Sequence, residues 1–369
     1  MRRHARRTLL FVAIVVLQFV VLEAGLRTWG SSEAAPSFQG LFTGDPLIGY
    51  RLQPGARIRF ATSEFDTQIA VNNAGVRDNE EVGPKPPGEK RIVILGDSLV
   101  LSVQVPFEQT FGELLEQRLN ASPRPHAAGH AVQYRVINAG VQGYGPVEEL
   151  LFFRRVVKPL EPDLVLTTVF VGNDAEEAVT SAPKLSERTA MTVLRESGIT
   201  RLRRAVRRSM VLQVLRLRLV SATERLRDFK GPPEPQLQSY AASPVARIAE
   251  GLDIARSCIA RIAAEAAADG ARSGIVLMPA RFQVDTPDYG RLREAVAQSG
   301  GELLRDAATD RFKAALSTLS LPMTDLLVPL RKAPSSPDLF FQKNVHLTPR
   351  GHVVVADHLA LFVTGLLER

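Results

Sequence analysis

Five short apolar runs, separated by helical patterns, constrain the fold of this chain more than any other feature. The runs are rich in Val, Ile and Leu, as expected of parallel strands that are covered on both faces. They span residues 91–95, 132–137, 163–171, 274–278 and 323–328. Strands that alternate with helices in this way predict an α/β fold, with a central parallel sheet between two layers of helices.

The chain divides into three parts around this sheet. Residues 1–29 are predicted to be a basic start and a membrane anchor, and residues 30–90 a tether followed by a small β extension. The extension is inferred from short alternating runs between Pro- and Gly-rich turns. Residues 91–369 form the predicted catalytic domain, and a basic helical cap is expected to interrupt it at about 176–242.

The first residues have the pattern of a membrane segment. Four arginines in residues 1–7 precede an apolar run, 8–22, that continues past Glu23 to Leu26. About 20 apolar residues span a bilayer, and Arg-rich flanks stay in the cytoplasm. The pattern therefore predicts a single-pass inner-membrane protein with its main domain on the periplasmic side. The alternative is a signal peptide that is cleaved near residues 32–34, after which the protein is secreted.

The net charge of +7 comes mostly from arginine and has two interpretations. Arginines alternate with apolar residues in 201–208 and 211–219, inside the expected cap. We interpret them as a solvated basic face, and the alternative is a lid against acidic lipid headgroups. No zinc-finger spacing or RNA-binding aromatic pattern accompanies the charge, so a nucleic-acid partner is not expected. Cys258 is alone in the sequence, which excludes an internal disulfide.

Polar residues follow the predicted strands where the strands end. Residues 96–98 (Gly-Asp-Ser) follow the first strand, 138–145 the second and 172–174 (Gly-Asn-Asp) the third, while 344–352 precede the last helix. The carboxyl ends of the strands in a doubly wound sheet face one crevice, so these segments should meet there. Ser98, at such a strand end, can act as a nucleophile if a base and an oxyanion hole lie nearby.

These segments supply the parts of an acyl-transfer site. Ser98 Oγ is the candidate nucleophile, and the oxyanion would be bound by the N–H groups of Ser98 and Gly140 and the side-chain amide of Asn173. His346 is the candidate base, because it lies just before the N-terminus of the last helix. The helix dipole there disfavours imidazolium and keeps the ring neutral, as a base must be.

In these residues the chain resembles the SGNH (GDSL-type) hydrolase superfamily. The family's four signature residues match, in order, Ser98, Gly140, Asn173 and His346. Upstream, residues 45–51 and 73–78 are similar to membrane-anchored bacterial members. The resemblance implies a flavodoxin-like three-layer α/β/α sandwich, serine esterase, lipase or acyltransferase chemistry, and no metal or other cofactor.

One position departs from the family pattern. The family usually carries Asp three or two residues before the histidine, and this chain has Lys343 and Asn344 there. A histidine base needs an acceptor on its Nδ1–H. Asn344 can accept through its amide oxygen, and Asp338 from the preceding loop is the alternative partner. We therefore hypothesise a Ser98–His346 dyad with a neutral partner.

Further residues are assigned to the surroundings of the site. Asp97 is expected to bond backbone N–H groups in the turn before the nucleophile. Asp97, Gln142, Tyr144 and Arg281 are pocket candidates, with plain packing as the alternative for Tyr144. His352 falls on the last helix and is expected to be a packed histidine. Exposure is expected for four glutamates that no spacing brings together, namely Glu148, Glu149, Glu176 and Glu177.

Three functions fit these observations. The leading hypothesis is a serine esterase acting on O-acyl groups of envelope glycans, and acyl transfer to a sugar would differ only in what attacks the acyl-enzyme. The second is a non-catalytic glycan- or partner-binding module on a degenerate hydrolase fold, motivated by the missing Asp. The third is a lipase or phospholipase, motivated by the basic cap and the membrane tether. The expected partner is thus an acylated small molecule, glycan or lipid.

Overall fold

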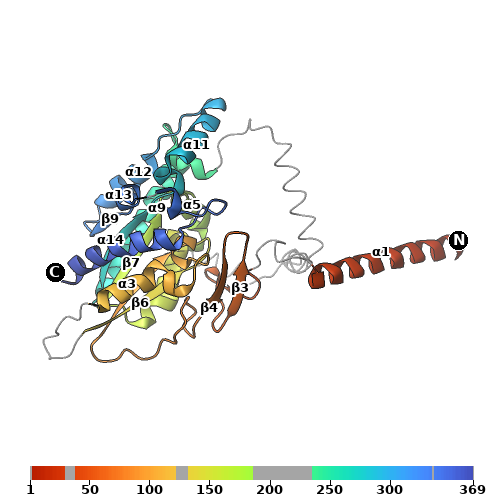
Figure 1. Ribbon diagram of the computed structural model, residues 1–369, viewed down its shortest axis with the longest axis horizontal. Coiled ribbons are helices and arrows are strands. Elements are labelled where there is room, and N and C mark those ends of the chain that lie inside the picture. The colour runs from red at the N-terminus through yellow and green to blue at the C-terminus, as the bar shows by residue number, and fades with distance from the viewer. Residues whose placement is uncertain (1, 30–37, 122–131, 186–234, 335, 369) are drawn as a thin grey trace.

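The computed structural model describes residues 2–29, 38–121, 132–185, 235–334 and 336–368, and its centre is a five-stranded parallel sheet (Figure 1). The strands are β5 (Glu89–Gly96), β6 (Gln133–Gly140), β7 (Leu164–Phe170), β8 (Arg272–Met278) and β9 (Met323–Asp325). Their order in the sheet, β6-β5-β7-β8-β9, corresponds to 2-1-3-4-5 when β5 is counted first. This is the flavodoxin-like order, so the predicted fold class is confirmed.

All five predicted strands are present, and the last is shorter than predicted. The sequence predicted a strand over 323–328, whereas β9 ends at Asp325 and helix α13 (Leu327–Lys332) begins two residues later. Leu326 and Leu327 are buried in the domain core. Their apolar character therefore reflects the packing of a helix start and not a continuing strand.

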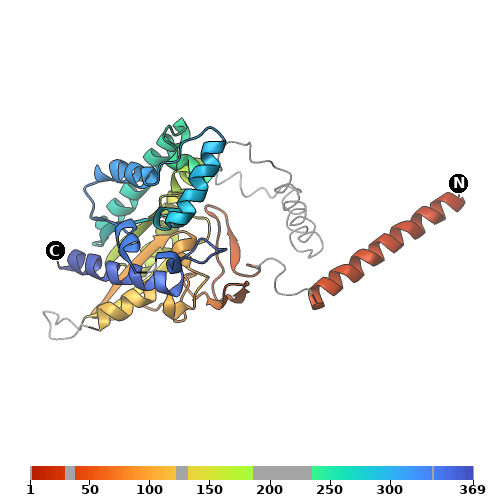
Figure 2. The same ribbon diagram turned by 45° about the horizontal axis from the view of Figure 1, so that its top comes forward.

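Helices cover both faces of the sheet. Successive strand residues point to opposite sides, and since both sets are apolar, each face needs a layer of helices to bury it. Ile92 and Ile94 of β5 pack with residues of α3 (Phe111–Asn120), α13 and α14 (Pro349–Leu367). Val93 and Leu95 pack on the other side with α4 (Pro146–Phe152) and part of α9 (Ala246–Ala268). The farther end of that side is covered by α5 (Asp174–Ser181), α9 and α12 (Ala307–Ser317). The result is a three-layer α/β/α sandwich (Figure 2).

Shorter elements connect these layers. The helix predicted from Pro146 to about Val157 changes form at Phe153, where α4 gives way to a π-helical turn, Phe153–Val157. The other short elements are α2 (Ser98–Leu101), α10 (Arg281–Val284), α11 (Thr286–Gln298) and 3₁₀ turns at Phe107–Gln109, Lys158–Leu160, Ala182–Leu185, Pro235–Tyr240 and Ser336–Leu339.

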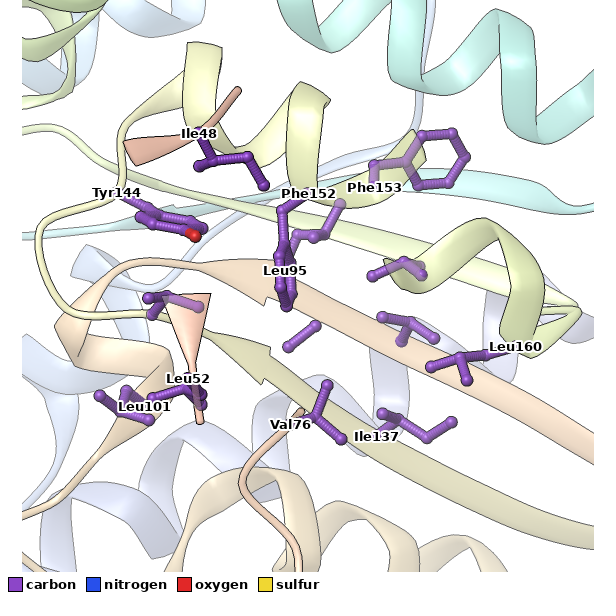
Figure 3. Packing of buried hydrophobic residues seen from close by; sticks show 14 of the residues in the cluster. Ile48, Leu52, Val76, Leu95, Leu101, Ile137, Tyr144, Phe152, Phe153 and Leu160 are labelled. Atoms are coloured by element: carbon purple, nitrogen blue, oxygen red, sulfur yellow. The ribbon is translucent and has the colours of Figure 1, made fainter. Parts of the chain in front are cut away.

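The predicted β extension consists of two antiparallel hairpins. The first pairs β1 (Phe42–Asp45) with β2 (Gly49–Leu52), and the second pairs β3 (Arg57–Ala61) with β4 (Asp66–Ala70). We call residues 38–82 the β extension. Its side chains Ile48, Leu52 and Val76 are fully buried in the same cluster as Leu95 of β5 and Leu101 of α2 (Figure 3). The extension and the α/β domain therefore share one hydrophobic core.

Two helices are apolar enough to be compared with a membrane span. α1 (Arg2–Trp29) contains the apolar segment Ile14–Gly25, in which Leu17 and Val21 are 62% and 63% exposed. α14 fits a span by length and composition, but its residues Val355 and Leu359 are fully buried against the sheet. α14 is therefore a core helix, whereas α1 presents apolar side chains without protein cover.

The expected cap over 176–242 is only partly described. Its first residues belong to α5, which begins at Asp174 and packs on α9 as part of the α/β domain. The chain is described again from the 3₁₀ turn Pro235–Tyr240 onward. The Arg-rich segments 201–208 and 211–219 lie outside the described residues.

Candidate active site

Ser98 is the first residue of α2 and follows β5 after a single residue. Two glycines, Gly96 and Gly140, lie opposite each other where β5 and β6 end. A Cβ atom on Gly96 would collide with Val100, and one on Gly140 would collide with the α2 backbone. Only glycines therefore let α2 lie this close to both strand ends. This packing places Ser98 at the carboxyl edge of the sheet, as predicted.

His346 lies in a short loop, residues 340–347, which we call the histidine loop. The first and last residues of the loop form an antiparallel bridge, and Phe341 N–H donates to His346 O at 3.0 Å. Thr348 caps the N-terminus of α14, because its hydroxyl accepts a first-turn N–H at 3.3 Å. The loop is thus closed at its base and anchored on the helix that was predicted to begin there.

His346 connects Ser98 to Asn344. His346 Nε2 lies 2.9 Å from Ser98 Oγ, and His346 Nδ1 lies 2.5 Å from Asn344 Oδ1. Asn344 Oδ1 also accepts the backbone N–H of His346 at 3.2 Å, and because that group only donates, it identifies the oxygen end of the amide. An amide oxygen only accepts, so Nδ1 carries the proton and Nε2 is free to accept the proton of Ser98.

The charged residues near the histidine do not replace this neutral partner. Burial lowers the pKa of His346 to about 4, so its ring is neutral above that pH. Lys343 is directed to the β extension, where its Nζ donates to Ser63 Oγ at 3.0 Å. Asp338 is exposed, and among the described residues its carboxylate makes no hydrogen bond with His346. The geometry is that of a dyad oriented by Asn344.

Gly140 does not provide the free oxyanion donor that the sequence suggested. Its N–H donates to Asn138 Oδ1 at 3.1 Å, and the Asn138 amide is fixed by donating to Val100 O at 2.7 Å. The backbone of Gly140 is therefore already bonded, and the residue is required for the close contact of β6 with α2. The expectation for Gly140 is corrected from donor to packing residue.

The turn after β6 offers a different backbone N–H, that of Gly143, which the sequence motif did not single out. Tyr144 N–H donates to Val141 O at 3.2 Å, and Gly143 adopts φ +69° within this turn, a conformation that favours glycine. Tyr50 OH donates to Gln142 O at 2.6 Å, and because the peptide is trans, Gly143 N–H points the opposite way. Gly143 is exposed, and its N–H makes no hydrogen bond within the described chain. The sequence signal that could have identified Gly143 is a glycine three residues after the strand end, in a turn position that favours positive φ.

Asn173 precedes α5 but does not cap it in the described structure, because its side chain bonds elsewhere. Asn173 Nδ2 donates to Glu177 Oε1 at 2.8 Å, which leaves the second hydrogen of the amide for a ligand. Burial, together with the smaller effect of the charges of Asp97 and Glu148, raises the pKa of Glu177 to about 8. Glu177 is therefore protonated at neutral pH and orients Asn173 without a negative charge.

The glutamates expected at the surface are buried or half-buried instead. Glu148 and Glu149 are 3% and 1% exposed, because α4 packs beside α5 against the sheet, and Lys184 Nζ binds Glu148 at 2.5 Å. Burial raises the pKa of Glu149 well above its ordinary value and that of Asp97 to about 7. Asp97 also accepts the N–H of Leu99 at 2.8 Å, as expected for the turn. Despite these carboxylates, no group in the described chain is arranged to hold a metal ion.

Arg281 contacts the histidine loop. Its Nη1 donates to the carbonyl oxygens of Phe341 and Gln342 at 2.9 and 2.8 Å, and its Nε donates to Asp288 at 3.1 Å. These hydrogen bonds use the guanidinium to hold the loop, whereas the sequence suggested a pocket residue. Arg281 therefore supports His346 through the backbone.

Tyr144 and His352 are buried packing residues. Tyr144 is fully buried, and its OH donates to Tyr50 O at 2.5 Å, so packing was the correct alternative for it. His352 is 1% exposed and its Nδ1 accepts the N–H of Phe111 at 3.1 Å, which confirms the expected packed histidine. Gln142 is half-buried, with its carbonyl bound as described above.

Comparisons with known proteins give structural matches at low sequence identity. TesA matches with 14% identity over 75% of this chain and 99% of its own, with a TM-score of 0.40. A lipase/acylhydrolase from Enterococcus faecalis matches with 13% identity over 75% and 96%, with a TM-score of 0.42. A catalytic mutant of the acetylxylan esterase Axe2 from Geobacillus stearothermophilus matches with 14% identity over 74% and 94%, with a TM-score of 0.39. No family model and no curated protein matches the chain. Function is therefore argued from the site itself.

Proposed function

We propose that this protein is an SGNH (GDSL-type) serine hydrolase that cleaves carboxylic esters. The observation that carries the proposal is the hydrogen-bonded series Ser98 Oγ, His346 and Asn344, with distances of 2.9 and 2.5 Å. A serine nucleophile is activated by a neutral imidazole whose free nitrogen accepts the hydroxyl proton, and by an acceptor that fixes the imidazole from the other side. A packed structural serine would not require a histidine whose tautomer is fixed in this way.

In the proposed reaction, Ser98 Oγ attacks the acyl carbonyl carbon while His346 Nε2 takes its proton. The oxyanion is bound by the N–H groups of Ser98 and Gly143 and by Asn173 Nδ2. Collapse of the tetrahedral intermediate breaks the ester bond, and the imidazolium of His346 returns the proton to the leaving alkoxide. Water then attacks the acyl carbonyl carbon while His346 takes its proton, and the bond from Ser98 Oγ to the acyl group breaks as the imidazolium returns that proton to Ser98. A sugar hydroxyl in place of water would make the reaction an acyl transfer.

The substrate is proposed to be an O-acylated glycan of the cell envelope. The support is the exposed apolar segment Ile14–Gly25 of α1, preceded by four arginines, which suits an inner-membrane anchor with the α/β domain on the periplasmic side. An enzyme held there meets envelope glycans and their acyl groups. A lipid substrate is the competing outcome.

A fluorophosphonate probe tests the proposed chemistry, because it reacts with activated serines. The full-length protein should be labelled stoichiometrically at Ser98, and both Ser98→Ala and His346→Ala should abolish labelling. Ser257→Ala is the matched control, because this serine is exposed on α9 and bonds only its own helix in the described structure. A wild-type protein that stays unlabelled while folded would favour the binding module over the enzyme. Activity on acetylated glycans but not on phospholipids would establish the substrate class.

A further inference from the structure

The histidine loop is held by a segment far away in the sequence. Glu64, at the tip of the β3–β4 hairpin, accepts the backbone N–H of Lys343 through Oε1 at 2.9 Å. Ser63 accepts from Nζ of the same lysine at 3.0 Å. Lys343 immediately precedes Asn344, whose amide oxygen orients His346. The hairpin tip therefore fixes the backbone that carries the partner of the base.

Aromatic rings reinforce this contact. Phe65 packs on Phe341 of the histidine loop with ring centroids 5.3 Å apart. On its other side, Phe65 packs on Phe60 at 5.6 Å, and Phe60 stacks on Phe38 at 4.5 Å. Such ring pairs stabilise their own geometry beyond the burial of apolar area. A continuous row of rings thus runs from the start of the β extension to the histidine loop.

The β extension also contacts the turn that contains Gly143 and the helix that begins with Ser98. Tyr50 sets the direction of the peptide before Gly143 through the hydrogen bond described above. Arg77 is fully buried and donates to the carbonyl oxygens of Leu101 and Val105 at 2.7 and 2.6 Å, at and after the end of the helix that begins with the nucleophile. Figure 3 shows the buried side chains Leu52 and Val76 of the extension in one cluster with Leu101 of this helix. The helix that begins with Ser98, the turn that contains Gly143 and the histidine loop therefore all contact the β extension.

We propose that the β extension is a positioning part of the active site, with Glu64 as the residue that orients the histidine loop. The inference rests on the proposed function, because loop placement affects catalysis only if His346 is the base. Glu64 acts through Lys343 and is a positioning residue, not a catalytic one. Its bond to a backbone N–H needs an acceptor oxygen and no charge, so an amide oxygen at the same place should serve equally.

The test compares three variants of the full-length protein in detergent. Glu64→Ala removes the acceptor, and Glu64→Gln keeps an acceptor oxygen at the same place. Asp66→Ala is the control, because it breaks an exposed pair with Arg59 on the same hairpin and leaves the loop contact intact. Two readouts are used, namely kcat and KM for a short-chain aryl ester, and hydrogen–deuterium exchange of the peptide covering residues 340–347.

For Glu64→Ala we expect kcat to fall roughly 10-fold, below the roughly 10²-fold that a 1 Å misplacement can cause. KM should stay within about twofold, because substrate binding is not changed. Exchange in the histidine loop should become faster, while Glu64→Gln and Asp66→Ala should behave as wild type. The proposal is overturned if Glu64→Ala leaves loop exchange unchanged, or if Glu64→Gln loses as much as Glu64→Ala. If the wild type neither hydrolyses esters nor reacts at Ser98, the proposed function fails, and exchange alone still decides the positioning role.

Discussion

Replacing Asn344 by Asp should make this site faster and change its pH dependence. The substitution keeps the length of the side chain and the oxygen that accepts from His346 Nδ1 at 2.5 Å. It adds one negative charge next to the ring. The imidazolium that forms when Ser98 loses its proton would then be stabilised by an ion pair instead of an amide dipole.

The structure sets the size of this effect. Burial lowers the pKa of His346 to about 4. An opposite charge in contact raises a pKa by about 1–3 units, and each unit corresponds to about 1.36 kcal/mol. Because the imidazolium is largely formed in the transition state, Asn344→Asp should raise kcat by roughly 10–10²-fold. In the template triad, Asn in place of Asp lowers kcat about 10⁴-fold because it imposes the wrong tautomer. Asn344 already accepts from Nδ1, so the gain here should be smaller.

The assay is kcat/KM for a short-chain aryl ester between about pH 3 and pH 9. The base must be neutral, so on the acid side wild-type activity should not fall until the pH drops through about 4. In Asn344→Asp this acid limb should move up to about pH 5–7. Asn344→Leu, which has a similar volume and no acceptor, should lose most activity because the tautomer is no longer fixed. A wild-type acid limb at the ordinary histidine pKa of 6.5, or a lower kcat/KM for Asn344→Asp, would contradict the proposed roles of His346 and Asn344.

Four further results are expected. Ser98→Ala should abolish hydrolysis of short-chain aryl esters while the circular dichroism spectrum stays that of the wild type. Asn173→Ala should lower kcat about 10²–10³-fold, the usual effect of one oxyanion donor, and an unchanged rate would make it a turn residue only. The raised pKa of Glu177 means that it gains a charge only above about pH 8, next to the oxyanion donor, so wild-type activity should decline there and a Glu177→Gln profile should stay flat. A reporter that is active only in the cytoplasm, fused after Arg369, should be silent, and a strong signal from it would contradict the proposed topology.

The sheet and the proximity of Ser98 to His346 could be predicted because their signals are local. Each strand was a short apolar run, and the strand order places all carboxyl ends at one edge. Ser98 and His346 are 248 residues apart, yet each occupies a position that local sequence defines, a strand end and the residues before a helix N-cap. The fold then brings the two positions together.

The proposed oxyanion donor Gly143 and the burial of the acidic residues could not be predicted in the same way. Gly140 ends β6 and Gly143 lies in the turn that follows, and only the structure shows that Gly140 N–H is bonded to Asn138 while Gly143 N–H has no partner in the described chain. Glu148 and Glu149 are buried because α4 packs beside α5, a contact between helices that periodicity does not specify. The contact of Glu64 with the histidine loop joins residues 279 positions apart.

The neutral partner and the low pKa of His346 together predict how the activity of the site varies with pH. A general base is most effective when its pKa lies near the working pH, so a base with a pKa of about 4 is weak at neutral pH. An ordinary triad histidine, with a pKa near 6.5, is protonated and inactive in acid. His346 stays neutral down to a pH of about 4, and the amine of Lys343 is bonded to Ser63 and not to the ring. This site should therefore lose little activity between neutral pH and about pH 5. Slow turnover that persists in acid is therefore the property that distinguishes this arrangement from a charged triad.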